Sequence, residues 1–174
     1  MFNRGDPYVD SAMRAYEGCA NLGPRTLFMS ERECERNGLN GVDVLVIPKA
    51  LALSDDAFHA IERFVEAGGV TIRQGNPFPY DRQGISRTDT VTGSKRTILL
   101  RSEDSVRAYL DALDAAYALD GLNAPPRPVN EFDYPIDGVK SRFAVHERVP
   151  YLYLMNLREE PVRVKLTGEY SSGM

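Results

Sequence analysis

The stretch VDVLVIPKALALSDDAFHAIERFVEAGGVTIRQ, residues 42–74, decides the fold of this chain. Its apolar run at residues 42–47 is typical of a central strand that is covered on both faces. Ser54 is the expected N-cap of the helix that follows, and Gly68-Gly69 is expected to end this helix with a left-handed C-cap. The chain then extends again at residues 70–72. The pattern predicts a strand–helix–strand crossover, the unit from which parallel sheets are built.

The flanking segments continue the alternation of helices and strands. In chain order they predict a helix at 7–21 with Asp6 as N-cap, a strand at 26–29, a brief helix with a Ser30–Glu33 capping box, a strand at 96–101, and a helix capped by Ser102 that ends near 118. This order indicates an α/β domain with a flavodoxin-like parallel sheet flanked by helices. Such folds begin with a strand, whereas this chain begins with a helix. We therefore expect the first strand to be missing and the chain to be a fragment of a larger one.

The last third of the chain differs in composition. Residues 123–137, NAPPRPVNEFDYPID, carry four prolines and predict an extended linker. Three short strands are expected beyond it, at 141–145, 151–155 and 162–166, arranged as a small antiparallel meander. The predicted organisation is an α/β domain at 1–122, a linker at 123–137 and a β extension at 138–174.

Composition and charge exclude several classes of function. The 174 residues are 43% hydrophobic and 26% charged, which is ordinary for a globular protein with one core. A formal net charge of −4 argues against a nucleic acid or an anionic membrane as partner. No apolar run approaches the ~20 residues needed to span a bilayer. Because the first ten residues contain no apolar h-region, we expect a cytoplasmic protein.

Several segments resemble a known family. The patterns PYVDSAMRAYEGCANLG, LFMSERE and the stretch at 42–72 are similar to the class I glutamine-amidotransferase-like domain of family 42 glycoside hydrolases, which are β-galactosidases of carbohydrate metabolism. In that family it is called the trimerisation domain. The tail RFAVHERVPYLYLMNLREEPVRVKL resembles the small β domain that ends such enzymes. The resemblance implies that the catalytic carboxylates lie on an upstream barrel of ~250 residues, for which this chain has no room.

The chain also lacks the groups that amidotransferase chemistry needs. That chemistry requires a cysteine on a strand-to-helix elbow beside a histidine base, but Ile47-Pro48-Lys49-Ala50 occupies the corresponding position. Cys19 and Cys34 fall in helical segments, and we expect both to be reduced and partly buried. His59 is expected at a helix surface and His146 at a strand end. No cluster of cysteine and histidine has metal-ligand spacing, so we expect no metal and no cofactor.

The candidate contact site is the polar loop that follows the second strand of the crossover. Open α/β sheets bind ligands at the carboxyl ends of their strands, where this loop begins. Its aromatic and charged side chains are suited to stacking on a sugar ring or to anchoring a subunit interface. The alternative is a proline-stiffened loop whose aromatics cover the core. The candidate residues are Asn76, Phe78, Tyr80, Asp81 and Arg82.

Two hypotheses about function remain open at this point. The first is a non-catalytic accessory and oligomerisation domain of a glycoside hydrolase, which borders a sugar-binding cleft and whose partner is a second copy or the glycosidase barrel domain. Its interface is expected on the 75–93 loop and near Phe132 and Tyr134. The second is a stand-alone module that binds a carbohydrate or another small molecule without catalysis. Tyr151 and Tyr153 are possible sugar contacts, but alternate strand positions more often pack inward.

Overall fold

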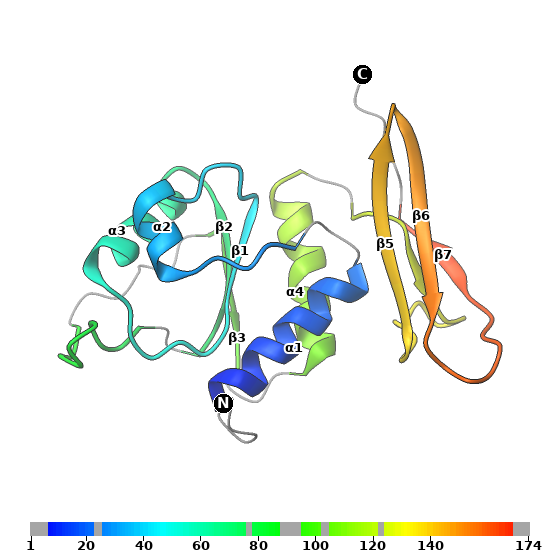
Figure 1. Cartoon of the computed structure of the whole chain (residues 1–174), viewed down its shortest axis with the longest axis horizontal. Helices are drawn as coiled ribbons and strands as arrows, with labels where there is room; N and C mark the ends of the chain where they lie inside the picture. The colour runs from blue at the N-terminus through cyan, green and yellow to red at the C-terminus, as the bar shows by residue number, and fades with distance from the viewer. Residues whose placement is uncertain are drawn as a thin grey trace.

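The computed structural model describes residues 7–22, 26–75, 78–87, 95–101, 105–121 and 124–168. Helices α2 and α3 lie on one side of a sheet, α1 and α4 lie on the other, and a long hairpin stands beyond them (Figure 1). None of the described helices is long and apolar enough to cross a membrane. The elements are α1 (Pro7–Leu22), α2 (Glu31–Asn37), β1 (Val44–Ile47), α3 (Asp55–Glu66), β2 (Val70–Gln74), β3 (Thr97–Leu100), α4 (Val106–Leu119), β4 (Arg127–Val129), β5 (Val139–His146), β6 (Val149–Asn156) and β7 (Lys165–Thr167).

The main sheet has the strand order β1-β2-β3, and both pairings are parallel. Val44 pairs with Val70, and Ile72 pairs with Ile98. The predicted α/β fold, with a parallel sheet between helices, is confirmed. One detail was wrong: β1 is an outer strand of the described sheet, and β2 occupies its centre with all five residues buried. An apolar run shows that both faces of a strand are covered, but it does not show that both edges are paired.

Each face of the sheet carries its own core, because neighbouring side chains of a strand point to opposite faces. One core joins α1 and α4 to β2, and Val44 and Val46 of β1 pack against it. The other core contains Ile47 and joins α2 and α3, and Leu45 packs against it. The sheet therefore lies between two helical layers.

The helix starts test the predicted caps. Ser30 and Glu33 form the predicted capping box, and the Ser54 hydroxyl accepts a hydrogen bond from the Ala57 amide at 3.3 Å. The prediction for the last helix was wrong by one turn, because its N-cap is Ser105, whose hydroxyl accepts from the Ala108 amide. Ser102 and Asp6, the other predicted caps, lie outside the described residues.

The strand predicted at 26–29 is not formed. This segment belongs to no strand, and Leu27 and Phe28 are 65% and 76% exposed. A strand requires a neighbour that completes its ladder of hydrogen bonds. The strand pairings of the described residues do not include this segment, so its apolar composition alone does not make it a strand.

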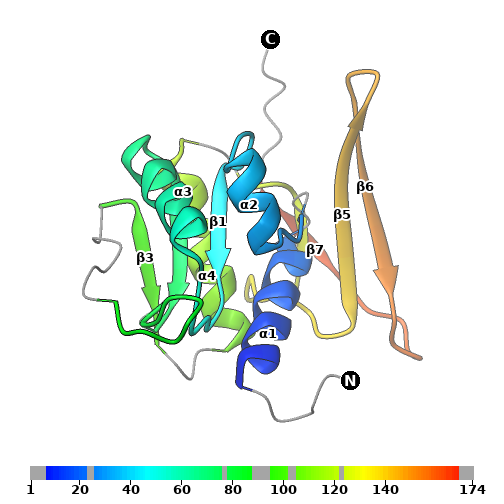
Figure 2. The same ribbon diagram turned by 60° about the vertical axis from the view of Figure 1, so that its left-hand side comes forward.

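The predicted three-stranded meander was also wrong. β5 and β6 form an antiparallel hairpin, whereas β7 pairs with β4, a strand inside the region predicted as a linker. Val129 of β4 is completely buried, so this proline-rich region is part of the packed structure. Pro128 is compatible with a short edge strand, which needs few backbone donors. Figure 2 shows the hairpin standing apart from the sheet, and Lys140 of β5 donates to Asn21 of α1 at 3.3 Å.

A testable consequence concerns the close approach of α1 and α4. A Cβ added to Gly18 would lie 2.6 Å from the Cβ of Tyr109, which is itself fully buried. We expect Gly18→Ala to lower the free energy of unfolding by about 1–3 kcal/mol through overpacking, although alanine favours helix. Urea unfolding measures the change. Met13→Ala, at a half-exposed position of the same helix, is the control and should change it by less than about 1 kcal/mol.

Candidate functional site

The loop after β2 lies along the segment that follows β1. The Phe78 amide donates to the Ala50 carbonyl at 2.9 Å, and the Tyr80 amide donates to the Leu51 carbonyl at 3.2 Å. The Leu53 amide returns a hydrogen bond to the Tyr80 carbonyl. These contacts give the described part of the loop, residues 78–87, a defined backbone at the carboxyl end of the sheet.

Of the five predicted contact residues, Phe78 is buried and Asn76 lies outside the described residues. Phe78 is 4% exposed and packs in the core under α3. Phe78 was predicted to contact a sugar or a subunit interface, and its burial leaves it without the exposure that such a contact needs. Phe78 instead fits the alternative prediction, in which the aromatic side chains of the loop cover the core. Tyr80 is 42% exposed.

Asp81 and Arg82 are occupied by internal contacts. The Asp81 carboxylate accepts hydrogen bonds from the Gln83 and Ile85 amides at 2.9 and 2.8 Å, which folds the loop back on itself. The Arg82 guanidinium lies 3.0 Å from the Glu31 carboxylate of α2. A ligand that used these charges would have to displace the contacts that hold the loop in place.

Two side chains of the loop, Tyr80 and Ile85, are exposed beside Leu51 of the segment that follows β1. We call these three residues the loop patch. Leu51 and Ile85 are 58% and 65% exposed. Backbone hydrogen bonds join Leu51 to Tyr80, and Asp81 to Ile85, so the three residues are close together. An exposed apolar group beside a rigid loop is typical of protein–protein contacts.

The conformation of this loop is stabilised by contacts of Arg87 with α3 and with the segment that precedes α3. Its guanidinium lies over the Phe58 ring, 4.5 Å from the ring centroid, and 2.7 Å from the Asp55 carboxylate. It also donates to the Leu53 carbonyl at 2.6 Å. One side chain thus joins the end of the loop to α3, in contacts typical of arginine.

A second feature, which the sequence did not reveal, is a buried polar network at the carboxyl end of β2. Ser11, Gln74 and Tyr109 are almost completely buried. The hydroxyls of Ser11 and Tyr109 both donate to the Gln74 side-chain oxygen, the second at 2.9 Å. The Lys49 amide donates to the Ser11 hydroxyl at 3.0 Å. The polar ending of VTIRQ, in the second strand of the crossover, was the available signal.

This network holds elements in place and contains no catalytic pair. Among the described residues, no imidazole or carboxylate is hydrogen-bonded to Ser11, and a serine nucleophile needs such a base. His59 pairs with Glu62 on the surface of α3, and His146 is exposed at the end of β5, as predicted. No group of potential metal ligands gathers among the residues that the structure describes.

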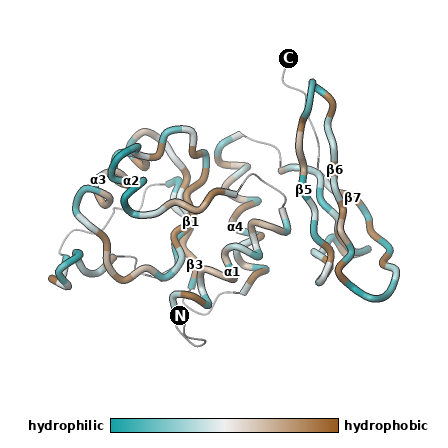
Figure 3. The backbone as a smooth tube through the Cα atoms, in the orientation of Figure 1, coloured by the Kyte–Doolittle hydropathy of each residue, from teal (hydrophilic) through white to brown (hydrophobic). Residues whose placement is uncertain are grey.

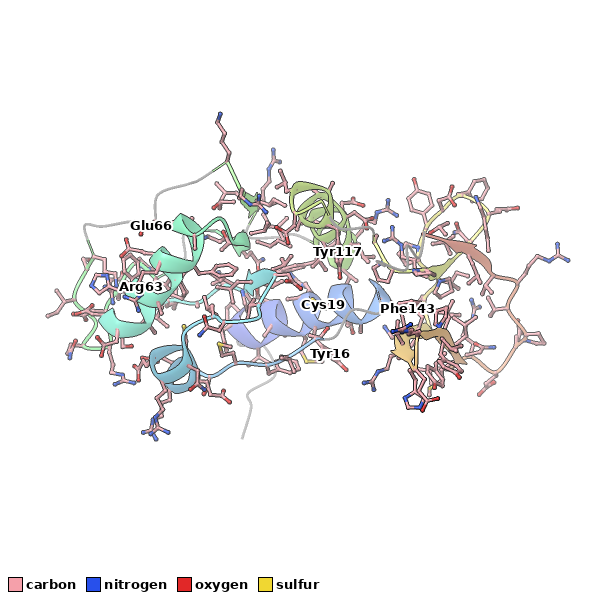
Figure 4. The ribbon with its side chains drawn as sticks, turned by 90° about the horizontal axis from the view of Figure 1, so that it is seen from above. Tyr16, Cys19, Arg63, Glu66, Tyr117 and Phe143 are labelled. Atoms are coloured by element: carbon pink, nitrogen blue, oxygen red, sulfur yellow. The ribbon has the colours of Figure 1, made fainter. Side chains whose placement is uncertain are left out.

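The two cysteines are free, as predicted, and both are buried more completely than expected. Burial raises the pKa of the Cys19 thiol to about 11. Burial, and then the nearby Glu35 carboxylate, raise the pKa of Cys34. Cys19 of α1 and Tyr117 of α4 lie in the region between the two helices (Figure 4). Because the thiolate is the reactive form, neither cysteine is suited to nucleophilic catalysis near neutral pH.

The second exposed surface is the outer face of the β5–β6 hairpin. Figure 3 shows apolar residues recurring along both strands of the hairpin. Tyr151 and Tyr153 are 41% and 60% exposed, and their rings stack with centroids 6.3 Å apart. The expectation that they pack inward was wrong, because a two-stranded hairpin leaves part of its surface without cover. Phe132 and Tyr134, the other predicted interface residues, are 69% and 51% exposed.

Comparison with known proteins gives one similarity, in fold. No family model matches the sequence, and no curated protein matches it. The structure is similar to the crystal structure of an apo GH42 exo-carrageenase from Bacteroides ovatus, with a TM-score of 0.65 and 16% sequence identity. The match covers 94% of this chain and 22% of that chain, so this chain spans about a fifth of the enzyme that it resembles. The fold is therefore one that occurs within a GH42 enzyme.

The buried network yields a prediction about stability. Gln74→Leu leaves the hydroxyls of Ser11 and Tyr109 without their shared acceptor, and unsatisfied buried donors are destabilising. We expect the free energy of unfolding to fall by about 1–3 kcal/mol. Thermal unfolding at fixed pH measures the change. The exposed Gln83→Leu is the matched control, and an equal loss in both variants would contradict the role given to the network.

The thiol of Cys19 yields a prediction about pH. Its pKa is raised from 9.0 to about 11 in the folded chain, so the folded state holds the proton more tightly than the unfolded state. The resulting stability is complete below pH 9 and is lost as pH rises toward 11, by up to about 2 kcal/mol. Cys19→Ala should lose less stability than the wild type between these two pH values. Urea unfolding at both pH values gives the comparison, and equal losses would contradict it.

Proposed function

We propose that this chain is a non-catalytic accessory domain of a glycoside hydrolase, which mediates assembly and borders the sugar-binding cleft of the catalytic domain. The observation that carries the proposal is the pair of coverages in the structural match. Nearly all of this chain is similar to about a fifth of a GH42 enzyme, as expected for one domain of a larger enzyme. Its partner is then a second copy of the chain or the barrel domain of the glycosidase.

The surfaces of the chain support a role in assembly. The charged members of the predicted site are held in internal contacts, whereas the loop patch presents apolar side chains. Interfaces are richest in aromatic and aliphatic anchors at their centres, with charged residues largely excluded. The loop patch has this composition, and it lies on a loop held by Arg87.

A second candidate function has one observation in its favour. The stacked, exposed rings of Tyr151 and Tyr153 form an aromatic surface on the hairpin, and aromatic faces stack on the apolar faces of sugar rings. In this alternative the chain is a stand-alone module that binds a carbohydrate without catalysis. It predicts that saccharide binding depends on the hairpin and does not depend on the loop.

The two candidates are separated by one pair of variants. If the chain assembles with a second copy, light scattering after size-exclusion chromatography will show a discrete oligomer. The double variant Tyr80→Asp, Ile85→Asp should shift this oligomer toward monomer and raise the dissociation constant by at least about tenfold. The reason is that desolvated charges disfavour an apolar interface. Tyr151→Ala with Tyr153→Ala is the control and should leave the oligomer intact. Phe78 is not used, because its burial makes it a folding residue.

Saccharide binding is measured on the same variants by titration calorimetry, with a neutral galacto-oligosaccharide and a carrageenan oligosaccharide as probes. A wild-type monomer that binds either probe through Tyr151 and Tyr153 would overturn the assembly role in favour of the second candidate. A monomer that binds neither probe would contradict self-association and the saccharide-binding candidate, and would leave the barrel domain as the partner to test by co-purification.

A further inference from the structure

The two strands of the β5–β6 hairpin contribute different kinds of side chain to one of its faces. Residues that are directly opposite in an antiparallel pair share a face, and so do alternate residues of each strand. Arg142 is opposite Tyr153, and Lys140 is opposite Met155. β5 therefore supplies a row of basic side chains, and β6 supplies a row of aromatic and apolar ones. We call this surface the hairpin face and define it by Lys140, Arg142, His146, Tyr151, Tyr153 and Met155.

Most of the hairpin face is open to solvent. Arg142, Tyr151, Tyr153 and Met155 are exposed. On the opposite face of the hairpin, Val139 is buried and Phe143 is half-buried. The hairpin also stands apart from the main sheet (Figure 2). A ligand can therefore reach the basic row and the aromatic row together.

The aromatic row offers an apolar platform. The rings of Tyr151 and Tyr153 are nearly parallel, with an interplanar angle of 23°. Ala144 is opposite Tyr151, and its methyl group is too short to cover that ring. Exposed aromatic rings of this kind are suited to packing against the apolar faces of sugar rings.

The basic row carries positive charge that no carboxylate of the described residues neutralises at Lys140 or Arg142. Neither side chain forms an ion pair within that part of the chain. The Lys140 ammonium donates to the side-chain oxygen of Asn21 at 3.3 Å, which is a neutral group. His146 differs, because the Glu147 carboxylate lies 3.9 Å from its imidazole. Arg142, exposed beside Tyr153, is thus the group best placed to bind an anion.

The charge of the hairpin is opposite in sign to that of the chain. Its two strands and their turn carry three basic residues, Lys140, Arg142 and Arg148, and one acidic residue, Glu147. The whole chain has a formal net charge of −4. Charges farther away than about 10 Å are largely screened at 0.1 M salt, so the local positive charge governs binding at this face. Charge complementarity therefore favours an anionic ligand.

The composition of the face also separates an anionic sugar from a neutral one. A neutral sugar needs several polar groups that converge on its hydroxyls, with hydrogen-bond acceptors among them. The eight positions of this face all lie within the described residues and include no carboxylate and no amide, since the remaining two are Ala144 and Val149. A guanidinium has donors only, and it pairs with oxyanions through two parallel hydrogen bonds.

We propose that the hairpin face binds an anionic saccharide chain, whose sugar rings pack on Tyr151 and Tyr153 while a sulfate or carboxylate group pairs with Arg142. β5 is eight residues long, which corresponds to about 25 Å, so the ligand is an extended chain of several sugar units. The inference rests on the proposed function for the choice of a saccharide. It adds the chemical class of that saccharide and the residue that selects it.

A nucleic acid fits the face less well than an anionic saccharide. Proteins that bind single strands combine stacking aromatics with a basic groove that follows the backbone, and binding of this type is driven by the neutralisation of many phosphates. The hairpin face has only two permanent charges, those of Lys140 and Arg142. A single-stranded oligonucleotide is therefore included in the test as a competing ligand.

The test compares three oligosaccharides of equal length by titration calorimetry at low salt. The probes are the neutral galacto-oligosaccharide, the sulfated carrageenan oligosaccharide and a carboxylated galacturonan oligosaccharide. We expect at least one anionic probe to bind about fivefold or more tightly than the neutral probe. This preference should shrink as the salt concentration is raised. The two anionic probes distinguish sulfate from carboxylate as the group that is recognised.

Three variants connect the preference to the hairpin face. Arg142→Gln removes the charge, and it should weaken the anionic probe by about threefold and leave the neutral probe unaffected. Arg163→Gln, at an exposed arginine in the segment before β7, makes the same change of charge elsewhere and should alter neither affinity. Tyr153→Ala should weaken every probe that binds, because it removes part of the aromatic platform.

Several results would overturn the proposal. These are no binding of the anionic probes, equal affinity for all three probes, and equal losses in Arg142→Gln and Arg163→Gln. Tighter binding of the oligonucleotide, lost in Arg142→Gln, would assign the face to a nucleic acid instead. Dissociation of an oligomer by Arg142→Gln would assign it to a subunit contact.

Failure of this inference is distinguishable from failure of the proposed function. An intact oligomer with no preference for the anionic probes overturns this inference alone. A monomer that prefers an anionic probe through Arg142 supports the inference and contradicts only the role in self-association.

Discussion

The complete burial of β2 is the constraint on which the rest of this structure depends. All five residues of the strand are buried, although three of them, Thr71, Arg73 and Gln74, carry polar side chains. Burial lowers the pKa of Arg73, which expresses the cost of holding a charge away from water. Gln74 is held by the hydroxyls of Ser11 and Tyr109, so the layer of α1 and α4 is fixed in register by hydrogen bonds as well as by packing. Apolar contact alone permits sliding, whereas this network does not.

The same constraint determines where the chain can present functional groups. With both faces of the sheet covered by helices, contact surfaces are confined to the ends of strands, to the edges of the sheet and to the hairpin. At the carboxyl end, the charged residues of the loop are used to hold its shape, and apolar side chains are left facing outward. Such a surface is suited to binding another protein chain and poorly suited to acid–base chemistry.

The sequence predicted the central part of this fold well because its signals there are local. The capping box at Ser30, the N-cap at Ser54 and the glycine pair after α3 each specify a boundary through groups a few residues apart. The apolar periodicity of the crossover then gave the order of the elements. The confirmed features are those that a short window of sequence determines.

The predictions that were wrong depend on distant partners. Whether β7 pairs with β6 or with β4 is decided by tertiary packing, and alternation along a strand carries no information about its neighbour. The burial of Phe78 depends on α3, which precedes it by many residues, and its loop position gave no sign of that contact. The Ser11–Gln74–Tyr109 network joins three elements that are far apart in sequence. Long-range pairing was the missing information in each case.

Residues 26–29 and β1 show the same distinction between local and distant determinants. Residues 26–29 carry the local signals of a strand, yet they belong to no strand, and the side chains of Leu27 and Phe28 are exposed. β1 likewise has the composition of a strand with covered faces but is paired on one side in the described sheet. In both segments the local sequence indicates a strand, whereas the pairing of each segment depends on residues that are distant in the sequence.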